Sequence, residues 1–237
     1  MSGRQIRATL HALITRVLDP GLCLGCSHAL DPGQYFCDAC GNTLECVPTP
    51  CSLCGLDNQS SNSICARCLH DPPRWQKMIA PLVYQGFGRD LLLQLKFSDS
   101  LHLANSLTTH LINHFRNSKP APEVLLPVPL HRKRLLERGY NQAFEIARIL
   151  SRLLDIPVDT RALHRIRNTD SQSGLSANQR EKNILKAFAY ATSSSYSHVA
   201  VVDDIVTTGS TVNEITKTLH RGGVKYVEVW GIARAFK

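Results

Sequence analysis

Two adjacent carboxylates and a cluster of small hydroxyl residues form the stretch of this 237-residue sequence that is best suited to chemistry. Asp203 and Asp204 directly follow the apolar residues 199–202. Adjacent carboxylates suit the hydroxyl groups of a sugar, or a Mg²⁺ ion that bridges to phosphate. The candidates to bind phosphate lie just behind them and are Thr207, Thr208, Gly209, Ser210 and Thr211.

The pattern around this cluster predicts a strand, a loop and the start of a helix. Residues 199–202 are typical of a buried strand, and Val212, Ile215 and Leu219 repeat at helical spacing. Backbone N–H groups that are free at a helix start bind phosphate, and Gly209 lets an anion approach the backbone closely. These features predict a pocket for a ribose 5-phosphate. The alternative is an ordinary strand with an Asp-rich turn in an α/β domain.

The segment VVDDIVTTGST resembles the phosphoribosyl-pyrophosphate loop of type I phosphoribosyltransferases. This resemblance implies an α/β fold in which helices flank a central, mainly parallel sheet. It also implies that Asp203 and Asp204 hold the ribose hydroxyls, that residues 207–211 wrap around the 5-phosphate, and that Mg²⁺ accompanies the ligand. It assigns no catalytic residue.

Eight of the nine cysteines fall into two units of identical spacing, C-x2-C-x10-C-x2-C. Four thiolates suit a tetrahedral zinc ion and leave no open position for substrate, so two structural zinc sites are predicted. Adjacent pairs of knuckles are favoured to share an ion, and interleaved sites are the alternative. Cys46 is left over between the units. The predicted ligands are Cys23, Cys26, Cys37 and Cys40 in the first unit, and Cys51, Cys54, Cys65 and Cys68 in the second.

Targeting signals and the distribution of charge further limit the classes of function that are possible. The N-terminus is no secretory signal and no apolar run reaches the length of a membrane span, so we expect a cytoplasmic protein whose cysteines bind metal rather than form disulfides. Residues 1–72 hold four Lys and Arg against six Asp and Glu, whereas residues 73–237 hold 23 against 13. A basic excess in the second part fits a phosphate-rich substrate or nucleic acid.

Three segments are predicted along the chain. Residues 1–20 form an amphipathic helix, residues 21–72 a small double zinc-ribbon domain, and residues 73–237 a phosphoribosyltransferase-like domain. The ribbon has few large apolar residues, so it needs metal to fold. Strands are expected at 77–85, 124–128, 156–158 and 161–166, and helices at 87–97, 101–115 and 142–154.

Two polar segments carry further candidates. The segment after residues 124–128 is rich in cations, and in a phosphoribosyltransferase the loop at this place would hold pyrophosphate; a solvated charged face is the alternative. The segment 167–188 has few core residues and should be mobile without ligand, and the resemblance implies a loop that closes over the site. The candidates are Arg132, Lys133, Arg134 and Arg138 in the first segment, and Gln172, Arg180 and Asn183 in the second.

Several motifs in the same order resemble the ComF/GntX family of bacterial proteins. They are the cysteine region, QLKF at 94–97, PVPLHRKRLLERGYNQ at 127–142, the residues Gln172, Leu175, Arg180 and Asn183 with the following Ala187 and Phe188, and the loop at 203–211. The resemblance implies a role in DNA uptake during natural competence, or in the use of external DNA as a nutrient, with proteins of the competence machinery as partners.

Three hypotheses for function follow. The first is an enzyme that transfers the phosphoribosyl group of phosphoribosyl pyrophosphate to an acceptor. The second is a non-catalytic protein that binds single-stranded DNA, in which aromatic residues are sparse for stacking. The third is a sensor or scaffold with a degenerate nucleotide site, and the intact acids and TTGST loop argue against it.

Overall fold

The computed structural model describes residues 21–31, 33–60, 62–97, 101–167, 184–191 and 195–236. The helix predicted at 1–20 lies outside these residues, as does most of the polar segment 167–188. The chain divides into two compact units, with the boundary between Leu44 and Glu45. The domain boundary proposed near residue 72 stays a prediction.

The described part of the smaller unit is built from turns and one short helix. An antiparallel bridge pairs Leu22 with Ala29. Helix α2 (Asp38–Asn42) follows, and the Cys37 sulfur caps it by accepting a hydrogen bond from the Cys40 N–H. A cysteine thus serves both as a helix cap and as a candidate metal ligand.

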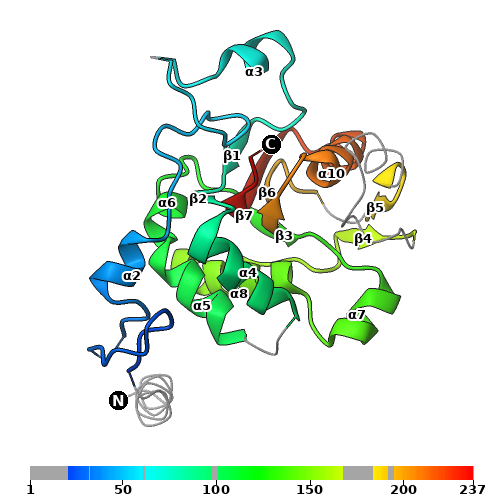
Figure 1. Ribbon diagram of the computed structural model, residues 1–237. Helices are drawn as coiled ribbons and strands as arrows, with labels where there is room; N and C mark the ends of the chain where they lie inside the picture. Colours follow the sequence, from blue (N-terminus) through cyan, green and yellow to red (C-terminus); the bar gives the residue numbers. More distant parts are fainter. Residues whose placement is uncertain are drawn as a thin grey trace, which may run out of the picture. The chain divides into compact units, whose positions relative to one another are not determined.

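A five-stranded sheet forms the centre of the larger unit (Figure 1). Its strands run in the order β1-β7-β6-β3, β2 pairs with the far end of β7, and every pairing is parallel. The strand predicted at 77–85 is therefore two short strands, which flank Ala80 and Pro81. The strands are β1 (Lys77–Ile79), β2 (Leu82–Val83), β3 (Val124–Pro127), β6 (His198–Val206) and β7 (Tyr226–Arg234).

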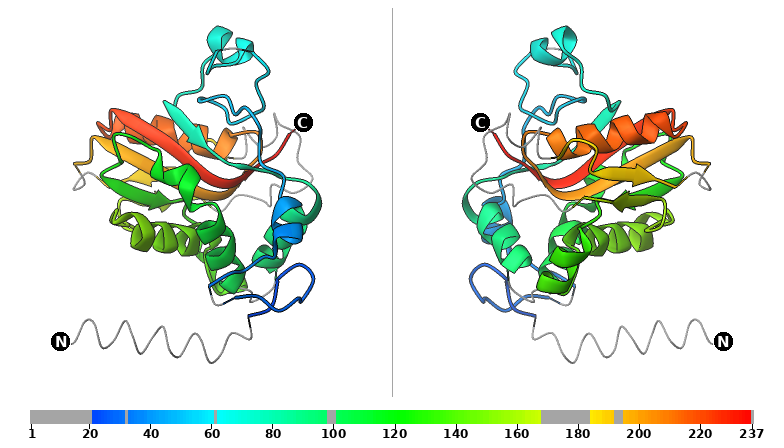
Figure 2. Two further views of the ribbon diagram at one scale, coloured as in Figure 1. Left: turned by 90° about the vertical axis from the view of Figure 1, so that its left-hand side faces the viewer. Right: turned by 90° about the vertical axis from the view of Figure 1, so that its right-hand side faces the viewer.

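Helices cover both faces of this sheet (Figure 2). Helix α8 packs against β3 and β6 on one face with α5 behind it, and α10 packs against β7 on the other. The helix predicted at 101–115 is divided at Leu111. The helices of this layer are α4 (Gly86–Phe97), α5 (Leu101–His110), α6 (Ile112–Arg116), α8 (Gln142–Leu154) and α10 (Ser210–Arg221).

The β-branched run of β6 is buried on both faces, as expected of a central parallel strand. Residues 199–202 are fully buried. Val199 and Val201 belong to the same core cluster as Ile215 and Leu219 of α10. The alternation of a strand places their neighbours on the face that α8 covers.

Two smaller elements lie outside the sheet. β4 (Leu163–Arg165) and β5 (Phe188–Tyr190) form an antiparallel ribbon, and helix α3 (Ala66–His70) follows Cys65. The strand predicted at 156–158 consists of a single bridge between Val158 and Leu125. In the part of the chain that the structure describes, no helix is both long and apolar enough to cross a membrane.

The cationic segment after β3 is a helix, α7 (Arg132–Arg138), where the sequence predicted a loop. His131 starts it by accepting a hydrogen bond from the Lys133 N–H at 3.3 Å, and Gly139 ends it in the left-handed region at φ 79°. The apolar residues Leu135 and Leu136 are exposed, so the helix has no core-facing periodicity that the sequence could reveal.

The fold predicts that a leucine-to-alanine substitution changes the free energy of unfolding very differently at two positions. Leu219 of α10 is fully buried, whereas Leu136 of α7 is 76% exposed. We expect Leu219→Ala to lower the free energy of unfolding by about 2–5 kcal/mol, and Leu136→Ala to change it by less than about 0.5 kcal/mol. Urea titrations followed by circular dichroism measure both, and equal midpoints for the two variants would contradict the assignment of α10 to the core.

Candidate functional site

A cavity of about 230 Å³ lies where β3 and β6 end. From β3 the chain leads to α8 on one face of the sheet, and from β6 it leads to α10 on the opposite face (Figure 2). Two neighbouring parallel strands whose connections leave on opposite faces open a crevice at their carboxyl ends, where ligands bind in this class of sheet. The topology therefore creates the cavity.

The paired acids line this cavity from inside β6. The strand continues through both of them to Val206, beyond the point where the sequence predicted its end. Asp203 and Asp204 are half-buried and both are among the lining residues. The Asp203 carboxylate accepts the Asp204 N–H at 2.9 Å, and the Asp204 carboxylate accepts the Ile205 N–H at 2.8 Å. These hydrogen bonds orient one oxygen of each acid and leave the carboxylates at the cavity wall.

The hydroxyl loop connects β6 to the first turn of α10. Gly209 caps the helix in the left-handed region at φ 81°. Four of the five predicted phosphate ligands line the cavity, namely Thr207, Gly209, Ser210 and Thr211. Thr208 lines a neighbouring hollow instead, and its hydroxyl lies 2.8 Å from that of Ser210. The structure thus brings together the acids and most of the loop.

Only part of the predicted cation set reaches the cavity. Arg134 and Arg138 line it, and they lie four residues apart on α7, so they share one face of the helix. Arg132 and Lys133 are exposed and do not line it. Gln172, Arg180 and Asn183 lie outside the described residues.

Arg165 of β4 is a cavity residue that the sequence analysis missed. Burial and the nearby Arg134 together lower the pKa of Arg165 to about 10, although Asp203 acts in the opposite direction. Its guanidinium carbon lies 5.6 Å from the centre of the Phe188 ring. The residue stays cationic at neutral pH. The signal was the alternation of the strand, since Arg165 is two residues from the buried Leu163 and thus on the same face.

The segment after α7 supplies further cavity residues, Asn141 and Gln142. The Asn141 side chain caps α8 by accepting the Ala143 N–H at 3.1 Å, and it donates to the Val128 carbonyl at 3.0 Å. Gln142 is buried, and its side-chain oxygen lies 3.5 Å from an Arg138 nitrogen. This segment therefore fixes the end of β3, the start of α8 and the orientation of a cation.

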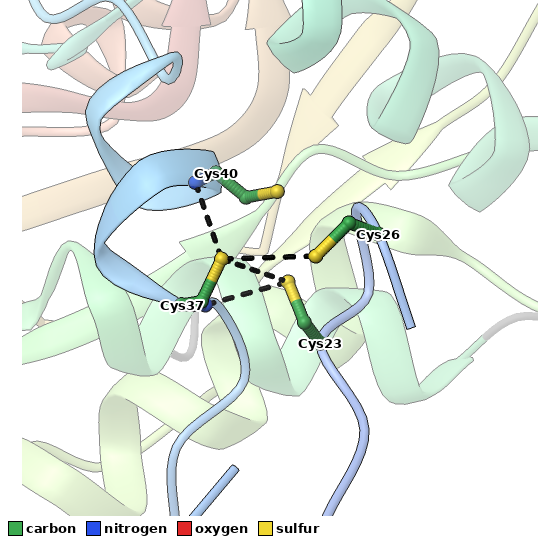
Figure 3. A group of neighbouring side chains, drawn as sticks. All are labelled: Cys23, Cys26, Cys37 and Cys40. Atoms are coloured by element: carbon green, nitrogen blue, oxygen red, sulfur yellow. Dashed lines mark hydrogen bonds between the residues drawn. The ribbon is translucent and has the colours of Figure 1, made fainter. Parts of the chain in front are cut away.

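The cysteines form two separate groups of four, and each uses adjacent knuckles. Within each group the four sulfurs lie within 4.8 Å of one another. Figure 3 shows the first group, with the side chains of Cys23, Cys26, Cys37 and Cys40 directed toward a common centre. The interleaved alternative does not match this arrangement, and Cys46 belongs to neither group.

The geometry of both groups fits a zinc ion. Sulfurs at 2.3 Å from a tetrahedral ion lie about 3.8 Å apart. The Sγ atom of Cys37 lies 3.7 Å from that of Cys23 and 3.8 Å from that of Cys26, and the Sγ atoms of Cys54 and Cys65 are 3.8 Å apart. Each group could therefore hold zinc with all four coordination positions filled.

Backbone N–H groups support thiolate formation at the first cysteine of each group. Burial opposes the charged form of Cys23, but N–H donors that include Cys37 at 3.3 Å and Gly25 at 3.4 Å act against it, and together they lower its pKa to about 6. Cys51 has the same balance of burial and backbone donors, with Cys65 N–H at 3.3 Å, and its pKa falls to about 7. These lowered pKa values favour a thiolate at the first cysteine near neutral pH, whereas the pKa values of Cys26, Cys40, Cys54 and Cys68 are raised, so metal binding must release protons from these thiols.

The sheet, the crevice and the loop at α10 define a type I phosphoribosyltransferase-like protein. The model of the phosphoribosyl transferase domain family matches residues 140–234. Adenine phosphoribosyl transferase from Trypanosoma brucei, solved with AMP, pyrophosphate and ribose 5-phosphate, has a TM-score of 0.36 and 11% identity, covering 67% of this chain and 70% of that chain. A likeness this distant carries no weight here, and the assignment rests on the family match and the topology.

Curated relatives match nearly the whole chain. Competence protein F of Haemophilus influenzae is 38% identical over 90% of this chain and 95% of its own. DNA utilization protein YhgH of Escherichia coli K12 is 36% identical over 91% and 97%. Competence protein ComFC of Bacillus subtilis is 25% identical over 82% and 81%. The chain belongs to this family, ComF/GntX, of competence and DNA utilization proteins.

The cysteine geometry predicts two zinc ions per chain and assigns each to its own group. We expect Cys26→Ser and Cys65→Ser each to lose one ion, because each removes a ligand from a different group, and the double variant to lose both. Native mass spectrometry and elemental analysis measure this. Cys46→Ser is the matched control and should keep both ions. Loss of both ions in either single variant would point to shared ligands.

Proposed function

We propose that the cavity binds phosphoribosyl pyrophosphate, or a related phosphoribosyl group, together with Mg²⁺. The observation that carries the proposal is the convergence of three kinds of group on one cavity. β6 contributes Asp203 and Asp204, the start of α10 contributes hydroxyls and backbone N–H groups, and α7 and β4 contribute cations. No single element would supply this combination.

Each part of such a ligand meets a suitable partner. The 5-phosphate would accept hydrogen bonds from the first turn of α10 and from the hydroxyls of residues 207–211. The ribose hydroxyls would donate to Asp203 and Asp204. Mg²⁺ would be held by carboxylate and phosphate oxygens and would neutralise phosphate charge. The pyrophosphate would lie against Arg134 and Arg165, whose planar guanidinium groups can each donate two hydrogen bonds.

The same arrangement suits transfer of the phosphoribosyl group to a nucleophile. The bond from the anomeric carbon to pyrophosphate breaks, and its electron pair leaves with pyrophosphate. The nucleophile forms a new bond to that carbon and releases its proton. Because the transition state resembles an oxocarbenium ion, the task of the protein is positioning and charge stabilisation. Asp203 and Asp204 favour positive charge on the ring, and Arg134 and Arg165 favour the departing pyrophosphate.

The names of the relatives give this binding a biological setting. Curated relatives are named for competence and for DNA utilization. We therefore propose that the chain acts in DNA uptake or in the use of DNA as a nutrient, with proteins of the competence machinery as partners. A phosphoribosyl ligand is compatible with either role.

Calorimetry tests ligand binding directly. Wild type is titrated with phosphoribosyl pyrophosphate and Mg²⁺, and we expect saturable heat. Asp203→Asn/Asp204→Asn should weaken binding at least about tenfold, because hydrogen bonds to charged groups contribute about 1.5–3 kcal/mol. Arg134→Ala should also weaken it. Absence of heat with wild type overturns the proposal.

Matched controls separate the cavity from general charge effects. Asp90 is exposed on α4, so Asp90→Asn should bind as wild type does. Arg132 lies on the same helix as Arg134 but outside the cavity lining, so Arg132→Ala should bind normally. Equal losses for Arg132→Ala and Arg134→Ala would show that net charge, rather than the cavity, governs binding.

Single-stranded DNA binding is the second candidate, and a cluster of basic residues beside α10 favours it. Two hollows border this helix and Arg74. The residues that line these hollows include two acids, Asp71 and Glu214, and a larger number of cations. Those cations are Arg67, Arg74, Lys186, Lys217, Arg221 and the buried Arg234. A chain of phosphates could follow such a surface.

Fluorescence anisotropy with a labelled single-stranded oligonucleotide tests this candidate. We expect binding at low salt that weakens steeply as salt rises. Arg74→Ala/Lys217→Ala should weaken it and make the salt dependence shallower, by a slope of about 0.7 per lost phosphate contact. Arg116→Ala/Lys119→Ala, which removes two exposed cations at and beyond α6, is the control. A flat trace at low salt dismisses DNA binding.

A further inference from the structure

Arg234, the last residue of β7, joins two functional loops that are far apart in the sequence. Its side chain is buried. Nε donates to the Cys54 carbonyl at 2.7 Å, in the first knuckle of the second cysteine group. One terminal nitrogen donates to the Val206 carbonyl at 2.8 Å and also to the Thr207 carbonyl. A buried cation needs such partners, so this guanidinium fixes the backbone of both loops at once.

Trp75 makes a second connection between the same two loops. Its indole nitrogen donates to the Leu53 carbonyl at 2.5 Å, between Cys51 and Cys54. Its ring lies against Gly209, because a Cβ atom built on that glycine would be 3.0 Å from a ring carbon. The left-handed cap of α10 therefore packs on a side chain that is bound to the cysteine knuckle.

The knuckle as a whole is bound through its backbone. Three consecutive carbonyls, those of residues 52–54, accept hydrogen bonds from Met78 N–H at 2.8 Å, from Trp75 and from Arg234. Cys51 and Cys54 are buried. A movement of the backbone of residues 52–54 would therefore break at least one of the hydrogen bonds to Met78, Trp75 or Arg234.

We propose that the second cysteine group and the hydroxyl loop (residues 207–211, here called the phosphate loop) are energetically coupled, with Arg234 as the positioning residue between them. A metal ion on Cys51, Cys54, Cys65 and Cys68 holds the 52–54 carbonyls in place, and these hold Arg234 and Trp75. Those two side chains in turn hold the start of α10 in the form that accepts phosphate. By linkage, ligand at the loop must then raise the affinity for the metal by the same factor as the metal raises the affinity for ligand.

This inference rests on the proposed function and deepens it, because the ligand is the one proposed for the cavity. It differs from the view that the zinc ions only fold the ribbon. In that view ligand binding and metal binding would be independent, and their affinities would not respond to each other.

Zinc competition in the full-length chain tests the coupling. Cys26→Ser leaves the second group as the remaining zinc site, and a chromogenic chelator competes for its ion with and without phosphoribosyl pyrophosphate and Mg²⁺. We expect saturating ligand to raise zinc affinity by at least about fivefold, the lower end of typical coupling between sites. Cys65→Ser keeps the first group, and there the ligand should leave zinc affinity unchanged.

Arg234 variants separate positioning from general destabilisation. Arg234→Gln and Arg234→Lys should each bind zinc and ligand, but the ratio of zinc affinities with and without ligand should fall toward one. A residue with a merely structural role would weaken both affinities and leave the ratio unchanged, and that result overturns the role of Arg234. Retention of the full ratio by Arg234→Lys, whose single ammonium lacks the planar fork that donates to Cys54 on one side and to Val206 and Thr207 on the other, would overturn it too.

The outcomes distinguish failure of the coupling from failure of the proposed function. If calorimetry shows that the wild type binds the ligand and zinc affinity does not change, the coupling is overturned and the proposed function stands. If the wild type does not bind the ligand, both are overturned. An equal change at both cysteine groups would indicate global stabilisation and would overturn the specific link through Arg234.

Discussion

The hydrogen bonds of one buried guanidinium bring the separate parts of this site into register. β6 continues through its acids to Val206 and then leads into α10, and the Val206 carbonyl accepts hydrogen bonds from outside this segment, from the Ala235 N–H at 3.0 Å and from Arg234. Arg234 donates to the carbonyls of Val206, Thr207 and Ala235 from one terminal nitrogen and to the Cys54 carbonyl from Nε. Since buried charge is costly unless it is satisfied, these hydrogen bonds favour one arrangement of both loops and add to the support that lining residues such as Asn141 give the cavity.

The sheet explains why chemistry gathers at this edge. A parallel strand must be covered on both faces, so the chain that leaves β3 and the chain that leaves β6 take opposite sides. The crevice between α8 and α10 follows from that requirement. The polar residues of the site lie at this edge, with Asp203 and Asp204 near the end of β6 and Asn141 at the start of α8, whereas the apolar layers lie behind them.

Local patterns in the sequence predicted the elements that depend on local physics. The bounds of α8 and α10 follow from helical periodicity with Asn141 and Gly209 at their starts, and the two cysteine groups follow from the spacing of their knuckles. α7 was missed because its leucines face solvent, and the 77–85 strand was taken as continuous because a break at Pro81 changes no periodicity.

What the sequence did not reveal depends on contacts between distant residues. Arg165 reaches the cavity only because β4 pairs with β5, and Arg134 rather than Arg132 lines it only because α7 turns one face inward. The roles of Arg234 and Trp75 likewise require the knuckle to lie on the sheet. These contacts join residues of different elements, from 22 positions apart for Trp75 and Leu53 to 180 positions apart for Arg234 and Cys54, and a pattern along one segment does not show which residues meet in this way.

The separation between Arg234 and Cys54 also orders the events of folding. The two residues are 180 positions apart, so the knuckle emerges from the ribosome long before its anchor. Metal can load onto the cysteines at that early stage, because all four ligands of the second group lie within residues 51–68. The carbonyls of Val206 and Thr207 gain their hydrogen bonds from Arg234 only once β7 has paired with β6.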